Sequence, residues 1–184
     1  MWFLCGLGNP DKKYKFTRHN LGFNILDSII EKNNCILVKK DKNKELFKGK
    51  IGIHGCLLSK PLNYMNLSGS VIAELTNFYK IPKSKIIIIH DDLDLTLGKI
   101  KIKTGGGNGG HNGLRSIDKT IGKNYKRLRI GIGHPGLKEL VSPYVLDKFT
   151  REDRKIIDHK INELTKYFSL IFENDVLLLT KMAT

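Results

Sequence analysis

Short apolar stretches recur along the whole chain, and their spacing changes between the two-residue period of strands and the three-to-four-residue period of helices. Strands are predicted at residues 2–7, 48–53, 56–59, 86–89, 99–103 and 128–132. Helices are predicted over residues 21–32, from about Ser68, after Asn112 and from about Arg151. Strands that alternate with helices in this way indicate an α/β fold.

The apolar faces of these elements indicate how they pack. Ile86–Ile89 is apolar and β-branched throughout, which is typical of a strand covered on both faces. Residues 48–59 have the pattern of a hairpin, so the sheet is expected to be mixed. The side chains expected on the inner faces of the helices are Leu26, Ile29, Ile30, Val71, Leu75, Phe78, Ile157, Ile161, Leu164, Phe168 and Ile171. We therefore expect a single three-layer domain over residues 1–184, with a mixed, mostly parallel sheet and helices on both faces.

The length and the short apolar runs exclude several protein classes. A chain of 184 residues suits one domain with its own core. No apolar run approaches the roughly 20 residues that a bilayer-spanning helix needs, so we expect no membrane partner. The N-terminus lacks the basic start and the cleavage site of a secretory signal. Cys5, Cys35 and Cys56 are too far apart for a CxxC pair and cannot all form disulfides, so a cytoplasmic setting is expected.

The charge of the chain suggests an anionic partner without identifying it. There are 32 Lys and Arg residues against 18 Asp and Glu, a formal net charge of +14. Lysine supplies most of this excess, so compositional drift explains it as well as a polyanion does. The segment from Lys99 to Arg129 is more informative, because Asp118 is its one acidic residue among many basic ones. Glycines interrupt this segment where a backbone could approach a ligand closely, which makes it a candidate polyanion-binding face.

Two glycine-rich segments resemble nucleotide-binding motifs but lack essential residues. Gly6-Leu7-Gly8 follows a predicted strand, yet Asp11 stands where a dinucleotide fingerprint has its third glycine. The segment from Gly105 to Asn112 has His111 and Asn112 at the Lys and Ser/Thr positions of a phosphate-binding loop. The chain also has no GxSxG sequence, so a serine hydrolase of that type has no nucleophile.

The segment His90-Asp91-Asp92-Leu93-Asp94 leaves two interpretations open. A histidine and clustered carboxylates at the end of a strand could hold a hard divalent cation, as in a metal-dependent phosphodiesterase. Alternatively, one aspartate points inward and the others are solvated. A third class, an RNA-binding module without catalysis, rests on the charge alone.

A set of polar residues at the ends of the predicted elements suggests metal-free ester hydrolysis. His19 immediately precedes a helix, and a carboxylate such as Asp91 could fix its tautomer and raise its basicity. Asn9, Asn66 and Asn112 come from three separate loops and could bind carbonyl oxygens or a developing oxyanion. An alkoxide leaving group needs less assistance than an amine, so neither a metal nor a covalent intermediate is required. We expect no cofactor.

Five blocks of sequence resemble those of the bacterial peptidyl-tRNA hydrolases, in the same order and over nearly the whole chain. The first block is Gly6-Leu7-Gly8-Asn9-Pro10 with Tyr14 and Thr17-Arg18-His19-Asn20-Leu21-Gly22. The others are Lys60 to Gly69, His90 to Asp94, Gly105 to Gly113 and Leu128 to Pro135. Asp11, Asn108 and Asp147 depart from the usual pattern, but none of them replaces a matched catalytic residue.

The resemblance implies an enzyme that cleaves the ester between a peptide and the 3′ end of tRNA, and so recycles tRNA from prematurely released peptidyl-tRNA. It implies that His19 is the general base and that Asp91 orients it. It also implies that Asn9, Asn66 and Asn112 bind the substrate and that Met65 supports the site. The remaining matches are Tyr14 and Tyr64 near the tRNA end, and Lys101, Lys103 and Arg129 on the acceptor-stem phosphates. His111 is either functional or shapes its loop. We expect a monomer whose partner is tRNA.

Overall fold

The computed structural model describes residues 1–183 and contains one seven-stranded mixed sheet with the strand order β2-β3-β4-β1-β5-β7-β6. Four adjacent strands, β4, β1, β5 and β7, are parallel, while β3 and β6 run antiparallel to their neighbours. The strands are β1 (Trp2–Gly6), β2 (Ile36–Lys40), β3 (Lys44–Ile51), β4 (His54–Pro61), β5 (Ile86–Asp92), β6 (Ile100–Thr104) and β7 (Lys126–Gly131).

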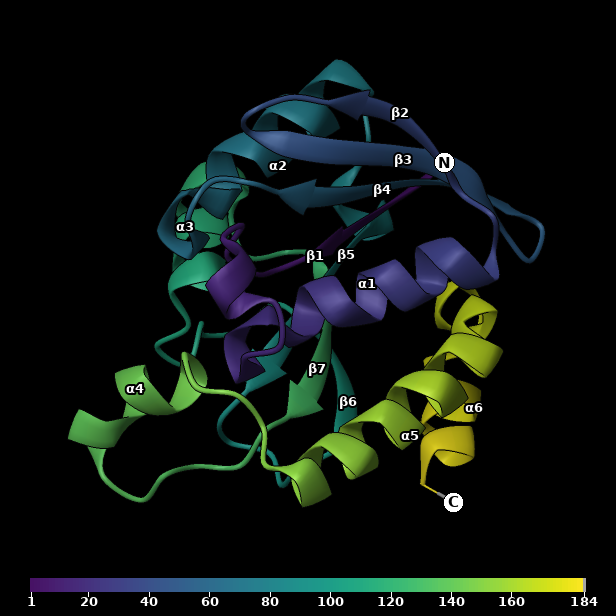
Figure 1. Ribbon diagram of the computed structural model, residues 1–184. Coiled ribbons are helices and arrows are strands. Elements are labelled where there is room, and N and C mark those ends of the chain that lie inside the picture. Colours follow the sequence, from purple (N-terminus) through teal and green to yellow (C-terminus); the bar gives the residue numbers. More distant parts are fainter. Residues whose placement is uncertain (184) are drawn as a thin grey trace.

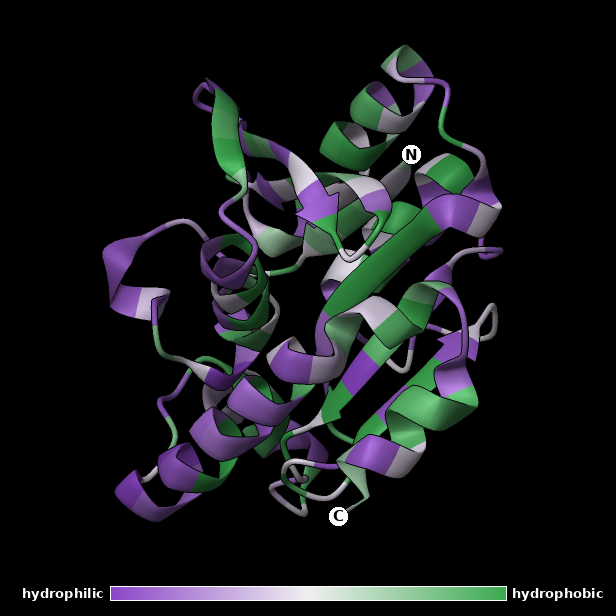
Figure 2. Cartoon of the chain, turned by 90° about the vertical axis from the view of Figure 1, so that its right-hand side faces the viewer, coloured by the Kyte–Doolittle hydropathy of each residue, from purple (hydrophilic) through white to green (hydrophobic). Residues whose placement is uncertain are grey.

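Helices cover both faces of the sheet, which confirms the predicted three-layer architecture (Figure 1). The helices are α1 (Leu21–Lys32), α2 (Ser68–Phe78), α3 (Asn112–Ile121), α4 (Val141–Val145), α5 (Arg151–Tyr167) and α6 (Asp175–Met182). Buried residues of α1, α5 and α6 form one core with one face of the sheet, and those of α2 and α3 form a second core with the other face. Figure 2 shows the hydrophobic residues gathered in the inner strands and on the inward sides of the helices.

Two glycines allow α1 to approach the ends of the central strands. A Cβ atom on Gly22 would overlap the carbonyl oxygen of Ile89, and one on Gly6 would overlap the carbonyl oxygen of Gly22. The amide of Phe23 donates to the carbonyl oxygen of Leu7 at 3.1 Å, so the start of α1 is tied to the end of β1. This close packing brings the residues just before α1 to the carboxyl end of the sheet.

The predicted strands and helices are present, but one inward-facing residue was predicted wrongly. Phe78 is 74% exposed, because α2 ends at this residue and the chain then turns, with Lys80 at a φ of 53°. Thr76 is the buried side chain at this end of α2, and its hydroxyl donates to the carbonyl oxygen of Ile72. The helix that begins at Arg151 ends at Tyr167, and Phe168 and Ile171 continue its buried stripe in a 3-10 helix.

Three elements were not predicted from the sequence: β2, α4 and α6. All side chains of β2 are exposed, so its sequence lacks the alternation that marks a half-buried strand. Helix α4 has only five residues, too few to show a helical period. In the described part of the chain, no helix is long and apolar enough to cross a membrane.

Candidate active site

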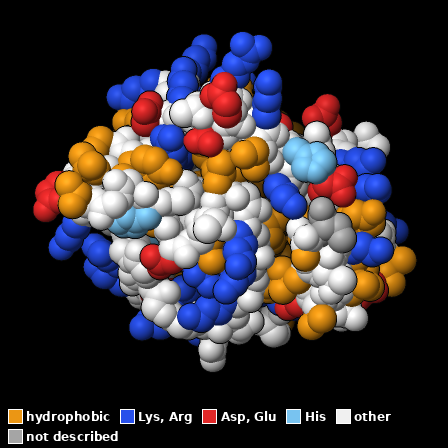
Figure 3. Space-filling view, turned by 90° about the horizontal axis from the view of Figure 1, so that it is seen from below, with side chains coloured by type: hydrophobic (Ala, Val, Ile, Leu, Met, Phe, Trp, Pro, Cys, Tyr) orange, Lys and Arg blue, Asp and Glu red, His pale blue; other side chains and the backbone are white. Residues whose placement is uncertain are grey.

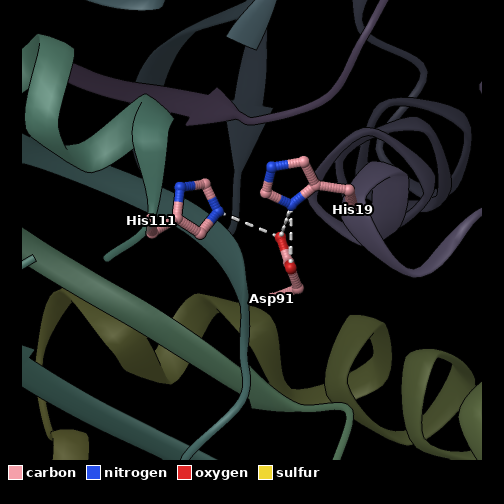
Figure 4. A group of neighbouring side chains, drawn as sticks. All are labelled: His19, Asp91 and His111. Atoms are coloured by element: carbon pink, nitrogen blue, oxygen red, sulfur yellow. Dashed lines mark hydrogen bonds and ion pairs between the residues drawn. The ribbon is translucent and has the colours of Figure 1, made fainter. Parts of the chain in front are cut away.

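The carboxylate of Asp91 is the centre of a buried cluster at the carboxyl end of β5. The strand is buried from Ile86 to Asp91, and Asp91 itself is 3% exposed. Two imidazoles reach this carboxylate, His19 from beside α1 and His111 from the start of α3, so the cluster joins the two helical layers (Figure 4). Open α/β sheets bind ligands at this end of their strands.

His19 is held in the tautomer that a general base requires. It lies in a 3-10 turn, Arg18–Asn20, that leads directly into α1. Its Nδ1 atom lies 2.9 Å from Oδ2 and 3.1 Å from Oδ1 of Asp91, so Nδ1 carries the hydrogen and donates it to the carboxylate. The other nitrogen, Nε2, is therefore unprotonated, and His19 lines the cleft described below.

The charge of the cluster raises the pKa of His19 above its ordinary value. Burial alone would lower this pKa, but the charge of Asp91 and its hydrogen bond to His19 outweigh burial. Burial would raise the pKa of Asp91, yet the two imidazoles hold it well below its usual range. Asp91 is therefore ionised at every pH at which the protein is expected to work, and it supports a basic His19.

His111 makes contacts on both sides of its ring, one set to the start of α3 and one to Asp91. Its Nδ1 atom caps α3 by accepting hydrogen bonds from the amides of Gly113 at 3.1 Å and Leu114 at 3.4 Å. The hydrogen must then be on Nε2, which donates to Oδ1 of Asp91 at 3.0 Å. Burial lowers the pKa of His111, which favours the neutral imidazole that the acceptor role of Nδ1 requires. The residue thus shapes its loop and also orients the central carboxylate.

The donor set does not suit a metal ion. Among the described residues, the one group of potential metal ligands consists of His19, Asp91 and His111, whose ligand atoms lie within 4.8 Å of one another. His111 cannot coordinate through Nε2, because the bonds to Nδ1 require a hydrogen on Nε2. This leaves His19 and Asp91, fewer than the three protein ligands of a typical catalytic zinc site.

The residues of the metal alternative, His90 to Asp94, point in different directions. His90 is buried and donates from Nδ1 to the carbonyl oxygen of Asp91 at 2.7 Å. Burial and the nearby His111 lower its pKa to about 3. Asp92 accepts a hydrogen bond from Nε of Arg129 at 2.7 Å, and the side chain of Asp94 is exposed. The second interpretation therefore holds for the inward-pointing Asp91 and the solvated Asp94, but not for Asp92, whose side chain is 11% exposed because it pairs with Arg129.

Asn9 is fixed at the edge of the cleft with its amide nitrogen free. Its Oδ1 accepts from the amide of Met65 at 2.9 Å, which leaves the NH₂ group without a partner in the part of the chain that the structure describes. The side chain of Asn20 holds the backbone of Asn9 through two hydrogen bonds of 2.8 Å each. Asn20 was not assigned a role from the sequence, although it lies in the block Thr17–Gly22.

An open cleft of about 1040 Å³ surrounds the cluster, and most of the predicted substrate-binding residues line it. Those that line it are Asn9, Tyr64, Met65, Asn66, His111 and Asn112, together with His19 and Asp91. Another wall consists of Val141, Ser142, Val145 and Leu146. Tyr14 is half-buried and is not among the residues that line the cleft. Tyr64 is 55% exposed, and its hydroxyl donates to Oδ2 of Asp11 at 3.1 Å.

The predicted phosphate-binding residues lie on the β6–β7 pair, at one edge of the sheet. Lys101 pairs in register with Arg129, and Lys103 pairs with Arg127, so all four cations share one face. Lys101 and Lys103 are exposed, whereas Arg129 bonds Asp92. The charge of this segment is less available than the sequence suggests, since Arg127 is buried and Lys126 bonds Asp175. Figure 3 shows Lys and Arg side chains spread widely over one face of the molecule, with Asp and Glu scattered among them.

This arrangement has the parts that hydrolysis of an activated ester requires. His19 supplies a basic nitrogen that faces the cleft, and Asp91 stabilises the protonated imidazole. The amide of Asn9 supplies a hydrogen-bond donor that is already oriented by Met65.

Comparisons with known proteins agree with this chemistry. The sequence profile of the peptidyl-tRNA hydrolase family matches residues 3–183. A peptidyl-tRNA hydrolase from Rickettsia canadensis is 46% identical over 175 residues, which are 95% of each chain. One from Rhizobium etli is 42% identical over all of this chain and 76% of its own length. The crystal structure of the peptidyl-tRNA hydrolase from Acinetobacter baumannii superposes with a TM-score of 0.92 at 40% identity, covering 99% of this chain and 94% of that one. The chain therefore belongs to the peptidyl-tRNA hydrolase family.

Proposed function

We propose that this chain hydrolyses the ester bond between a peptide, or an N-blocked aminoacyl group, and the 3′ end of tRNA. The observation that carries this proposal is the hydrogen bond between His19 and Asp91 in the cleft of a chain that belongs to this family. The reaction would free tRNA from peptidyl-tRNA that has been released prematurely. We further propose that the chain works as a monomeric single domain in the cytoplasm and needs no metal.

In the proposed mechanism, water is activated by His19. Nε2 takes a proton from a water molecule, whose oxygen attacks the ester carbonyl carbon. Asp91, which is ionised and buried, stabilises the resulting imidazolium through the bond at Nδ1. The tetrahedral intermediate then collapses, the bond to the ribose oxygen breaks, and His19 returns its proton to that oxygen. The products are the free carboxylic acid and a tRNA with an intact terminal ribose.

The amide side chains bind the acyl part of the substrate. The free NH₂ group of Asn9 donates to a peptide carbonyl, which favours a blocked α-amino group over a charged one. Asn66 and Asn112 are exposed in the cleft and provide further donors for the substrate and the developing oxyanion. Met65, which is buried and bonded to Asn9, supports this arrangement.

The tRNA part of the substrate binds through its backbone and its last nucleotide. Lys101, Lys103 and Arg129 lie on one face of the β6–β7 edge, where they contact acceptor-stem phosphates. The ring of Tyr64 is exposed at the cleft and stacks on the terminal base or ribose. Tyr14 contributes to the same end of the tRNA from outside the lining of the cleft.

The proposal is tested with a pair of tRNA substrates that differ at the α-amino group. Purified protein is mixed with N-acetyl-aminoacyl-tRNA or with free aminoacyl-tRNA in the presence of excess chelator, and release of the amino acid is followed. We expect rapid release from the N-blocked substrate alone. Activity that disappears with the chelator and returns with a divalent ion would favour the metal-dependent alternative, and binding without release would favour an RNA-binding module.

A further inference from the structure

A glycine-rich loop, residues 105–110, connects β6 to α3, and Asn108 is its one residue with a side chain beyond hydrogen, accepting from the amide of Gly110 at 3.1 Å. It joins Lys103, near the end of β6, to His111, the capping residue of α3. The glycines with positive φ are Gly105 (73°), Gly106 (90°), Gly109 (57°) and Gly110 (78°). Glycine adopts such angles readily but leaves the backbone free to move, and the Asn108 bond holds only the second half of the loop, so contacts from neighbouring elements are needed to fix residues 105–107.

Arg127 on β7 holds the loop through hydrogen bonds to two of its carbonyl oxygens. Its guanidinium donates from Nη1 to the carbonyl oxygen of Gly107 at 2.6 Å and from Nη2 to that of Gly106 at 3.2 Å. Nη2 also bonds Oδ1 of Asp118 on α3 at 3.1 Å. One buried side chain thus ties the loop to the helix that carries the active-site residues.

Two neighbours, the aromatic Tyr125 and the acidic Asp118, hold the Arg127 guanidinium in this position. The ring of Tyr125 lies 4.8 Å from the guanidinium carbon, and its hydroxyl donates to the same oxygen of Asp118 at 2.8 Å. Arg127 is 2% exposed, whereas Lys101 and Lys103 on the same face of the sheet are exposed. A buried arginine is costly unless it is paired, and here the pairing partners include two loop carbonyls.

The loop also lies directly against Lys103. A Cβ atom on Gly106 would overlap the end of the Lys103 side chain, so the ammonium group of Lys103 lies next to the loop. At its other end the loop leads into His111 and Asn112, which line the cleft. The loop therefore connects the surroundings of Lys103 on the β6–β7 edge to two residues that line the cleft.

We propose that Arg127 is a positioning residue that sets this spacing. The inference rests on the proposed function, because in that proposal Lys103 binds a phosphate and Asn112 provides a donor for the acyl part of the substrate. Arg127 touches neither part of the substrate. It acts by holding the loop, so that the acceptor stem and the ester are engaged at the same time.

The test uses Arg127→Lys, which keeps the charge but cannot reach both carbonyls and Asp118 together. The matched control is Lys44→Met, which removes another buried cation, bonded to Glu74 at 3.0 Å, on β3 away from the cleft. Two substrates are compared: N-acetyl-aminoacyl-tRNA, and the same acyl group on a short oligonucleotide that ends in CCA and lacks the stem. Melting temperatures of all variants are recorded, and assays are run well below them.

We expect Arg127→Lys to lower kcat about tenfold on both substrates, since small misplacements of reacting groups have effects of this size. Its preference for tRNA over the short substrate, expressed as a ratio of kcat/KM, should also fall. Lys44→Met should lower the melting temperature without changing either quantity. If Arg127→Lys folds poorly, Tyr125→Phe removes one bond of the same cluster, and smaller changes in the same directions are expected.

Hydrogen–deuterium exchange of residues 104–112 supplies a readout that does not depend on activity. Exchange in this segment should be faster in Arg127→Lys than in the wild type or in Lys44→Met. Unchanged exchange, or unchanged kcat together with an unchanged substrate preference, would overturn the proposal. If the wild type releases neither acyl group, the proposed function fails, and the exchange measurement still decides whether Arg127 anchors the loop.

Discussion

His19, which lines the cleft, donates from Nδ1 to Oδ2 of Asp91 over 2.9 Å, and this bond leaves Nε2 as its unprotonated nitrogen. The same carboxylate accepts from Nε2 of His111 at 3.0 Å. Oδ1 thus lies within hydrogen-bond distance of both imidazoles, and Oδ2 accepts from His19. Two donors on one side chain favour its ionised, acceptor-only form.

The substitution Asp91→Asn should lower kcat by at least about a hundredfold, in line with the usual contribution of general-base catalysis. An amide has one acceptor oxygen, so either His19 or His111 would face an NH₂ group. The matched substitution Asp94→Asn, at an exposed carboxylate of the same segment, should leave kcat within about twofold of the wild type. Equal losses in the two variants would instead support metal binding by this segment.

The pH profile of kcat/KM should reflect the raised pKa of His19. Because the base must be neutral, activity falls as the pH drops through this pKa, and the midpoint should lie above about 6.5, the ordinary value for histidine. In Asp91→Asn the midpoint should move to lower pH, since the charge that stabilises the imidazolium is gone. A midpoint that is the same in both proteins would show that a different group controls the profile.

Two substitutions of His111 should separate its two roles. Asparagine can still cap α3 but cannot reach Asp91 in the same way, so His111→Asn should lower kcat while largely keeping the melting temperature. Alanine removes both contacts, and the loss of the cap should cost about 1 kcal/mol of stability in addition. Thermal melts and steady-state kinetics on both variants check this. If His111→Asn has the wild-type kcat, His111 acts only on the helix.

Gly113→Ala should disturb the wall that carries Met65. The added Cβ would lie 2.7 Å from Sδ of Met65 and 3.1 Å from Cε1 of His111, so these side chains must move. We expect a higher KM and a lower melting temperature. Gly55→Ala is the control, because no atom lies within 4 Å of its added Cβ. Similar kinetics for the two variants would mean that the position of Met65 does not matter to binding.

Lys101→Ala should weaken the binding of tRNA and reduce its dependence on salt. Each phosphate contact that is lost lowers the slope of log K against log salt by about 1. Lys50→Ala, at an exposed lysine of the segment 39–50 that has no assigned role, serves as the control and should leave the slope unchanged. If Lys50→Ala reduced the salt dependence and Lys101→Ala did not, the acceptor stem would instead bind near β3, toward the other edge of the sheet.

Elements with a strong period could be predicted from the sequence, and exposed or very short ones could not. The run Ile86–Ile89 identified a central strand because it is buried on both faces. Strand β2 showed no pattern, since its position depends on backbone pairing with β3 and not on burial of its side chains. Phe78 was predicted to face inward from the helical spacing of apolar residues, but it is exposed. That spacing does not show at which residue a helix ends and its side chains leave the core.

The candidate site could be predicted as a set of residues, but not as a network. Sequence motifs pointed to His19 and Asp91, which are 72 positions apart and form a direct hydrogen bond. The double role of His111 and the anchoring of Asn9 by Asn20 depend on tertiary contacts that spacing cannot reveal. The sequence also could not show that Arg127 is buried, so that one cation of the segment from Lys99 to Arg129 is not available to bind an anion at the surface.

The most direct test of the central claim is the single-turnover rate of His19→Ala on N-acetyl-aminoacyl-tRNA, with enzyme in excess so that binding is complete. His159→Ala, at an exposed histidine of α5, is the matched control. We predict that His19→Ala binds the substrate normally and releases the acyl group at least about a hundredfold more slowly than the wild type, while the control is unaffected. A rate for His19→Ala close to that of the wild type would contradict the assignment of His19 as the base.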